Sequence, residues 1–448
     1  TLQLLGTRHM YVTCLRQGPR RNPIFAIAGS SNLTPRYFQI GTSPKISSCT
    51  FSTMAAPPPS KRIRVTDVPC IVTMQGMMKG KENIMSLAQG IVHWQPPPSV
   101  AKAVSEAASQ PSSNSYCATE GLPELREALT KKLQVENGLE NVRIMVTAGA
   151  NQAYANIVTT LLDAEDATVL FAPYYFNHLM AIQMTGGADR VVFGQVDEAF
   201  LPDPSWLSDE LSAQGSKVKM VTIVNPCNPT GVIIPRDRLL ELSSICAKHG
   251  VWLIVDNTYE HFTYEDDGHP GHSCISGENI VNVFSFSKAF GMMGWRVGYY
   301  AYPERLHPEM LKAQDTIAIC PPVMSQKAAL AALTEGGADW VRERVRGLAE
   351  NRHAVASAVE DVLGKDAIVG GSGAIYLMAK LPVQDDFRVV DWLSSKHGVC
   401  VIPGSACGAP GMIRLAYANL ETKACLEASA RLKAGLLELK QRGVAVLD

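Results

Sequence analysis

Short, continuously apolar segments alternate with amphipathic segments through the middle of the chain, and this alternation constrains the fold more than any other feature. The apolar segments have the length of strands and lie at 142–147, 168–171, 218–224, 251–255, 280–284 and 296–301. Segments with helical periodicity lie between them, at 151–162, 176–184 and 236–249. A continuously apolar strand is typical of a parallel sheet that is covered by helices on both faces. The sequence therefore predicts an α/β fold with a mostly parallel central sheet and a ligand site at the carboxyl ends of its strands.

The pattern changes near residue 336, where the helical segments become more charged and the strands shorter. A long helical pattern covers 340–363. It is followed by strands at 375–379, 399–402 and 413–416 and by helices at 389–396 and 421–440. We therefore predict a large domain at 121–336, a smaller α+β domain at 337–448, and a segment at 76–120 that joins the small domain.

The start of the chain has a composition unlike the rest. Its first 66 residues contain no Asp or Glu but nine Lys or Arg. Because this composition is typical of transit peptides, we interpret residues 1–75 as a leader or a disordered segment. An equally good interpretation is that translation starts at Met54 and that residues 1–53 are not part of the protein. The first interpretation places the protein in a mitochondrion or chloroplast, and the second in the cytoplasm.

Charge, hydropathy and cysteine spacing exclude several classes of function. The net charge is −1 and no apolar run approaches the length of a membrane-spanning helix. We therefore expect neither a nucleic-acid nor a membrane partner. None of the 11 cysteines lies in a C-x-x-C arrangement, so the sequence predicts no disulfide framework and no metal site.

One lysine lies at the predicted ligand edge, in the segment Ser-Phe-Ser-Lys-Ala-Phe-Gly-Met-Met-Gly-Trp-Arg-Val-Gly at 285–298. A desolvated lysine has a lowered pKa and can form an imine with a carbonyl compound, which is the role we predict for Lys288. Ser285, Ser287 and Arg296 offer hydroxyl and guanidinium donors to a phosphate. The alternative, a solvated lysine in a turn, fits poorly because aromatic residues flank it.

A carboxylate follows the strand at 251–255. A buried Asp256 needs a cationic partner, and a protonated pyridine nitrogen would provide one and act as an electron sink. Alone, such an Asp is as often a helix cap. In the loop at 225–231, Asn-Pro-Cys-Asn-Pro-Thr-Gly, Asn228 can bind a ring hydroxyl or a substrate carboxylate. We do not expect Cys227 to be a nucleophile, because its motif contains no His or Lys to activate it.

Two further strand ends carry features of a ligand site. The strand at 142–147 is followed by a helix start at Ala150 and Asn151, where unpaired backbone N–H groups can bind an anion. Tyr175 follows the next strand and can stack on a flat ring. Either feature alone is weak evidence, since an aromatic residue there is more often part of the core.

In this order, the segments resemble the class I/II aminotransferase family of fold-type I pyridoxal 5′-phosphate (PLP) enzymes, over about residues 80–440. The segments at 87–97 and 174–177 are similar to plant-type aromatic/methionine aminotransferases. The resemblance implies that Lys288 holds PLP as a Schiff base and shuttles a proton. It also implies Asp256 on the pyridine nitrogen, and Tyr259 with Asn228 on the ring hydroxyl.

The other cofactor contacts follow from the same resemblance. Tyr175 would stack on the ring, and the phosphate would be held by Ala150, Asn151, Ser285 and Arg296. Tyr116 matches a tyrosine that the family lends to the phosphate of the partner subunit. The resemblance therefore implies a homodimer with shared active sites.

For the substrate, the resemblance implies that Arg414 grips the α-carboxylate and that Gly90 lets the N-terminal segment close. Trp94 and His93 are candidates for the side-chain pocket, although His93 is equally well interpreted as a structural histidine. Cys407 stands where many members of the family carry Phe.

The predicted function is a ping-pong transamination between an L-amino acid and a 2-oxo acid. We find no additional arginine for a second carboxylate, which favours aromatic amino acids or methionine. A lyase on the same scaffold, such as a cysteine-conjugate C–S lyase or an aminocyclopropane-carboxylate synthase, would use the same residues. A non-enzymatic regulator with this domain is a remote alternative.

Overall fold

The structure is a computed structural model that describes residues 56–185, 187–264, 268 and 271–447. Residues 1–58 and 59–448 form two separate units, and the description below concerns the second. The predicted start at Met54, and the part of the predicted leader before residue 56, lie outside the described residues.

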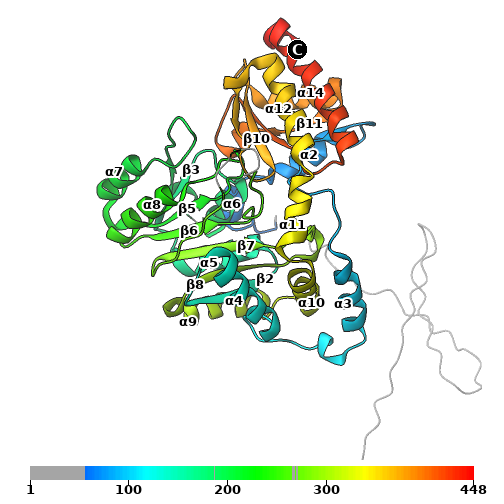
Figure 1. Cartoon of the computed structure of the whole chain (residues 1–448). Coiled ribbons are helices and arrows are strands. Elements are labelled where there is room, and N and C mark those ends of the chain that lie inside the picture. The colour runs from blue at the N-terminus through cyan, green and yellow to red at the C-terminus, as the bar shows by residue number, and fades with distance from the viewer. Residues whose placement is uncertain (1–55, 186, 265–267, 269–270, 448) are drawn as a thin grey trace, which may run out of the picture. The chain divides into compact units, whose positions relative to one another are not determined.

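A seven-stranded sheet in the order β2-β8-β7-β6-β5-β3-β4 forms the centre of the unit (Figure 1). Its strands are β2 (Val142–Thr147), β3 (Ala167–Phe171), β4 (Val191–Gly194), β5 (Val218–Val224), β6 (Trp252–Asp256), β7 (Ile280–Ser285) and β8 (Gly298–Pro303). Strands β4, β3, β5, β6 and β7 pair in parallel, whereas β8 is antiparallel to both of its neighbours. The predicted, mostly parallel α/β sheet is confirmed.

Helices cover both faces of this sheet, which explains why its strands are continuously apolar. On one face lie α5 (Ala150–Leu161), α6 (Phe176–Thr185) and α9 (His307–Ala318), packed on strand side chains such as Met220 and Ile254. On the other face lie α7 (Pro204–Gln214) and α8 (Arg236–Lys248). At the β2 end of the sheet, α4 (Pro123–Asn137) contacts β2, and its Leu129 and Leu133 belong to one buried cluster with Val146 and Phe284 of the sheet. Next to α4 lies α10 (Val323–Ala331), which in turn contacts α3 (Pro98–Ala108).

The C-terminal part contains an antiparallel sheet in the order β12-β13-β10-β9. Its strands are β9 (Ile368–Gly370), β10 (Tyr376–Lys380), β12 (Ile402–Pro403) and β13 (Met412–Ala416). Helices α12 (Ala349–Leu363) and α14 (Thr422–Arg442) lie side by side next to it (Figure 1). This part also contains α13 (Asp386–Trp392) and β11 (Val399–Cys400).

The single helix expected at 340–363 is in fact two, α11 (Gly337–Arg346) and α12. The break falls at Gly347 and Leu348, where the backbone turns. Glycine is a poor helix former, which favours a break at this position. Leu348 is fully buried at this break. The periodicity continues across it because both helices bury apolar faces, which is why the pattern alone suggested one helix.

The part of the chain that packs on the core begins earlier than the predicted boundary at residue 75. Two helices, α1 (Lys61–Val65) and α2 (Cys70–Met78), lie there, and Met74 is buried. Asp67 is paired with Gln183 of α6, since the Gln183 amide accepts from the Asp67 N–H at 2.9 Å and donates to its carboxylate at 3.0 Å. Further on, β1 (Met85–Ser86) pairs in parallel with β11. The apolar residues of α2 were obscured by the Pro-rich and basic residues before them.

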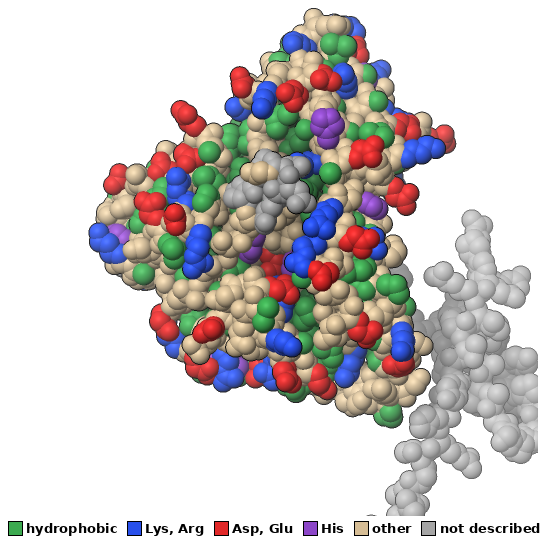
Figure 2. Space-filling view, in the orientation of Figure 1, with side chains coloured by type: hydrophobic (Ala, Val, Ile, Leu, Met, Phe, Trp, Pro, Cys, Tyr) green, Lys and Arg blue, Asp and Glu red, His purple; other side chains and the backbone are tan. Residues whose placement is uncertain are grey.

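Acidic and basic side chains are interspersed on the face shown in Figure 2. Within the described ranges, no single helix is long and apolar enough to cross a membrane. One bent pair, Glu304–Ala318 with Val323–Leu363, meets the length and composition criteria together, with a bend of 117°. The same ranges contain no group of His, Cys, Asp and Glu side chains that could hold a metal ion.

Candidate active site

A cavity of about 300 Å³ opens where strands β5, β6 and β7 end and where α5 begins. This is the edge at which the sequence predicts the ligand site. The cavity brings together these predicted site residues: Gly90, Ala150, Asn151, Tyr175, Asn228, Asp256, Tyr259, Ser285, Ser287, Lys288, Arg296 and Arg414.

Lys288 lies just beyond the end of β7, at the cavity wall. Burial lowers the pKa of its amine from 10.5 to about 8, with a further lowering by the positive charges of Arg296 and Arg414. A substantial fraction of the amine is therefore neutral near pH 8. A neutral amine with this access to a cavity can act as a nucleophile toward a carbonyl and as a base.

Asp256 is the last residue of β6, and its carboxylate lines the cavity. Its Oδ2 lies 3.1 Å from Nε2 of His178, and its Oδ1 accepts from the Thr258 N–H at 3.0 Å. Burial alone would raise the pKa of Asp256, but the hydrogen bonds from His178 and Thr258 outweigh it and hold the pKa below its ordinary value. Asp256 is therefore a buried anion that can stabilise a cation in the cavity.

Tyr259 faces the cavity from the loop that follows β6. Its hydroxyl lies 2.7 Å from the hydroxyl of Tyr376, which comes from β10 in the C-terminal part. Burial raises the pKa of both phenols, so both are neutral and can donate a hydrogen bond. The pair therefore offers a hydroxyl donor to a ligand and connects the two parts of the chain across the site.

Arg414 reaches the cavity from β13 and is almost fully buried, with 1% of its surface exposed. It donates to the Asn228 side-chain oxygen at 2.9 Å and to the Ala88 carbonyl at 2.7 Å. Among the described residues, its Nε has no hydrogen-bond partner. A buried guanidinium with an unused donor and no carboxylate beside it is suited to bind the carboxylate of a ligand.

A second group of cavity residues offers donors for a phosphate. Arg296 comes from the loop before β8, and its Nη1 lies 3.5 Å from the Ser287 hydroxyl. The first N–H groups of α5, at Ala150 and Asn151, have no acceptor within their own helix. Gly149 precedes them with φ of +87°, and a Cβ there would collide with the Arg296 guanidinium. The glycine thus allows the helix start and the arginine to converge on one point.

Aromatic and aliphatic side chains complete the wall. Tyr175, held by a 2.9 Å hydrogen bond from Asn177, lies edge-on to His178. Ile71 of α2 and Ile91 add aliphatic surface. Gly90 packs against the Tyr376 hydroxyl so closely that any Cβ would overlap it. The N-terminal segment therefore forms part of the site.

Three predicted residues do not line this cavity. Trp94 is a correction: its indole stacks on Phe262 and donates to the Ala289 carbonyl at 3.3 Å, so it packs in the core. His93 lies 3.1 Å from the Ala418 carbonyl, as its structural interpretation predicts. Tyr116 is 79% exposed and does not line the cavity of its own chain.

The two cysteines near the site behave as buried, protonated thiols. Burial raises the pKa of the Cys227 thiol, which lies in an adjacent apolar pocket. Burial also raises the pKa of the Cys407 thiol, to about 12. Neither thiol is therefore activated for nucleophilic attack.

Three residues of the cavity wall were not predicted from the sequence: His178, Tyr376 and Ile71. His178 was visible only as one histidine in a predicted helix. The requirement that a buried Asp256 have a donor could have pointed to it. Tyr376 and Ile71 come from segments that meet the site only through tertiary folding, so no local pattern identifies them.

These residues fit PLP. The cavity has an amine for its aldehyde, an anion for its ring nitrogen, and a cluster of donors for its phosphate. The converging Arg296 guanidinium and α5 start, which require glycine at 149, fit a bound anion. A fold with parallel strands and a lysine–aspartate–arginine site of this kind defines a PLP-type enzyme.

Comparison with known proteins agrees with the assignment of a PLP site. Residues 82–432 match the model of the family "Aminotransferase class I and II", and the chain belongs to this family of PLP-dependent aminotransferases. It is 50% identical over 390 residues to the aromatic aminotransferase ISS1 of Arabidopsis thaliana, covering 86% of this chain and 98% of that protein. It is 32% identical over 345 residues to the aspartate/prephenate aminotransferase of Thermus thermophilus, covering 76% and 88%. A solved mutant of Thermus thermophilus aspartate aminotransferase superposes with a TM-score of 0.77 at 27% identity, covering 85% and 100%.

Proposed function

We propose that this enzyme binds PLP at Lys288 and transfers amino groups from aromatic amino acids or methionine to a 2-oxo acid. The observation that carries the proposal is the convergence of Lys288, Asp256 and Arg414 in one cavity. Each supplies one requirement of transamination: an amine, an anion for the cofactor ring, and a cation for the substrate carboxylate. When bound, PLP supplies an electron sink for the bond that breaks at the substrate Cα.

The residues of the chain would act as follows. Arg414 binds the α-carboxylate through its fork of donors and fixes the orientation of Cα. The Lys288 Nζ takes the proton from Cα, for which a pKa of about 8 is well matched to neutral pH. Asp256 stays anionic and holds a positive charge on the ring nitrogen. Tyr259 donates a hydrogen bond to the ring hydroxyl, with its orientation fixed by Tyr376.

The residues that line the cavity favour an amino-acid substrate with an apolar side chain. Among the described residues, the arginines that line the cavity are Arg296 and Arg414, both with roles already assigned. Ile71, Ile91 and Tyr175 add aliphatic and aromatic surface to the same cavity. An unpaired second carboxylate would be costly to bury against this surface. The name of the 50% identical relative, an aromatic aminotransferase, supports the same preference.

Steady-state kinetics with phenylalanine, tyrosine, tryptophan, methionine and aspartate test the proposal, with phenylpyruvate or 2-oxoglutarate as acceptor. We expect the aromatic donors or methionine to exceed aspartate by at least about tenfold in kcat/KM. Ile71→Ala should lower kcat/KM for phenylalanine by about tenfold, because an apolar wall is lost. Val72→Ala, on the same helix but exposed, is the matched control. Aspartate as the best donor would refute the proposed specificity.

The same residues would serve a C–S lyase or an aminocyclopropane-carboxylate synthase, so the reaction type needs its own test. A transaminase turns over only when a 2-oxo acid accepts the amino group. Continuous turnover of an amino acid without an acceptor would indicate the lyase.

We further propose a homodimer with shared active sites. The support is the position of Tyr116, which is 79% exposed and outside the cavity of its own chain. Sedimentation of the purified enzyme tests the dimer. Tyr116→Phe should weaken the binding of PLP if the hydroxyl reaches a phosphate in the partner subunit.

A further inference from the structure

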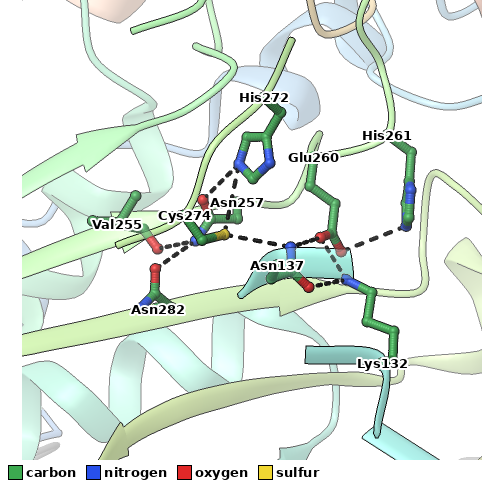
Figure 3. A network of polar contacts seen from close by, with 9 residues as sticks. All are labelled: Lys132, Asn137, Val255, Asn257, Glu260, His261, His272, Cys274 and Asn282. Atoms are coloured by element: carbon green, nitrogen blue, oxygen red, sulfur yellow. Dashed lines mark hydrogen bonds and ion pairs between the residues drawn. The ribbon is translucent and has the colours of Figure 1, made fainter. Parts of the chain in front are cut away.

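A buried polar network joins Lys132 and Asn137 of α4 to Asn257 and Glu260 in the loop after β6 (Figure 3). It begins at Lys132 of α4, whose Nζ lies 2.5 Å from Oε2 of Glu260. The two side chains are only 5% and 8% exposed. Asn137, in the last turn of α4, accepts from Lys132 at 2.8 Å and donates to Glu260 at 2.7 Å. The ion pair is therefore enclosed and bridged by a third polar group.

The carboxylate at the centre of this network is held in its charged form. Burial alone would raise the pKa of Glu260, but Lys132 overrides it and lowers the pKa to about 2. His261 lies 3.5 Å from the second carboxylate oxygen, and burial lowers the pKa of its imidazole to about 4. Lys132 is therefore the principal partner of Glu260 at neutral pH.

A second set of contacts in the network holds the start of the same loop. Asn257 is fully buried, and its amide donates to the Asn282 side chain at 3.0 Å. Its oxygen lies 2.9 Å from Nε2 of His272, and Asn137 also donates to the Cys274 thiol at 3.4 Å. The network thus fixes the loop at Asn257 and again at Glu260.

The two fixed points bracket residues that the site uses. Asp256 precedes Asn257, and Tyr259 precedes Glu260, so each site residue is a chain neighbour of a fixed one. The Glu260 N–H donates to the Asn257 carbonyl at 2.9 Å, which closes the segment into a tight turn. Glu260 faces Lys132, while Tyr259 faces the cavity. A displacement of Glu260 would therefore rotate the backbone that carries the Tyr259 hydroxyl.

We propose that Lys132 and Glu260 are positioning residues: their buried ion pair holds the 256–260 turn so that the Tyr259 hydroxyl meets both Tyr376 and the cofactor. The inference rests on the proposed function, because it assigns the Tyr259 hydroxyl a role in the reaction. It goes beyond that function by extending the machinery to α4, a helix that contributes no residue to the cavity wall. Neither Lys132 nor Glu260 lines the cavity.

The test is the double variant Lys132→Met/Glu260→Gln, which removes both charges and leaves no unpaired charge in the core. It is compared with Lys433→Met/Asp361→Asn, which removes an exposed ion pair of 2.7 Å. We measure kcat/KM for both double variants, each with and without the additional substitution Tyr259→Phe. We expect removal of the buried pair to lower kcat/KM about tenfold when Tyr259 is present and less than about twofold in the Tyr259→Phe background. The surface control should be without effect in both.

Two measurements besides activity complete the experiment. In the PLP-loaded enzyme, the pH midpoint of the cofactor absorbance should shift in the Lys132→Met/Glu260→Gln variant, because the Tyr259 hydroxyl no longer meets the ring hydroxyl in the same way. In the enzyme without cofactor, amide hydrogens of 257–262 should exchange faster than in the surface control. Equal losses of kcat/KM in both Tyr259 backgrounds would overturn the proposal, as would unchanged amide exchange. If Tyr259→Phe alone has no effect, the assigned role of Tyr259 fails, and amide exchange still decides whether the pair holds the turn.

Discussion

Lys288 should lower the free energy of unfolding of the cofactor-free protein. The variant Lys288→Met measures by how much. Burial and the charges of Arg296 and Arg414 lower the pKa of Lys288 from 10.5 to about 8. This difference corresponds to about 3 kcal/mol of the free energy of unfolding. Below pH 8 the amine is protonated in both folded and unfolded states, so the full penalty is present. As the pH rises toward 10.5, the folded protein releases its proton first and the penalty disappears.

Urea denaturation of the cofactor-free wild type and of Lys288→Met, at several pH values, measures this cost. The variant should be more stable by about 3 kcal/mol at pH 7, and the pH-dependent part of the gap should shrink to about 1 kcal/mol at pH 10. Methionine packing adds an offset that does not vary with pH, so the slope is the diagnostic quantity. Lys433→Met removes an exposed ammonium and should stay within about 0.5 kcal/mol of the wild type throughout. A gap that is independent of pH between 8 and 10 would refute the reasoning.

Two further predictions concern the electron sink and the N-terminal helices. Asp256→Asn should fold but react at least about a hundredfold more slowly in single-turnover assays, because a neutral amide cannot stabilise a cationic ring nitrogen; a rate near that of the wild type would contradict the assignment. Met74→Ala should lower the free energy of unfolding by about 2–5 kcal/mol, since Met74 is 1% exposed, whereas Val72→Ala should be nearly neutral. Equal unfolding midpoints for these two variants would show that α2 is not part of the core.

The sequence was most informative where one local pattern determines the structure. Continuous apolar runs predicted the strands around the site, and β2 and β5 have the predicted bounds. The residues that follow these runs, such as Asn228, Asp256 and Lys288, predicted part of the cavity wall, because parallel strands bring their carboxyl ends to one edge. Gly90, Tyr259 and Arg414 were expected only from the family resemblance.

Prediction failed where residues from distant segments meet. His178 was found only once its contact with Asp256 was visible, since a single histidine in a helix has no diagnostic spacing. Trp94 lies in a segment that is similar to aromatic/methionine aminotransferases, yet its ring stacks on Phe262, which tertiary packing determines and the local sequence does not. The Lys132–Glu260 pair joins residues 128 positions apart, and neither stands out in the sequence.

The most direct test of the central claim is to reduce the purified, PLP-loaded enzyme with borohydride and to map the modified peptide by mass spectrometry. The account predicts that the cofactor is attached at Lys288 and that phenylalanine, added before reduction, abolishes the attachment by converting the cofactor to its amino form. Attachment at another lysine, or none in an enzyme that still transaminates, would contradict it.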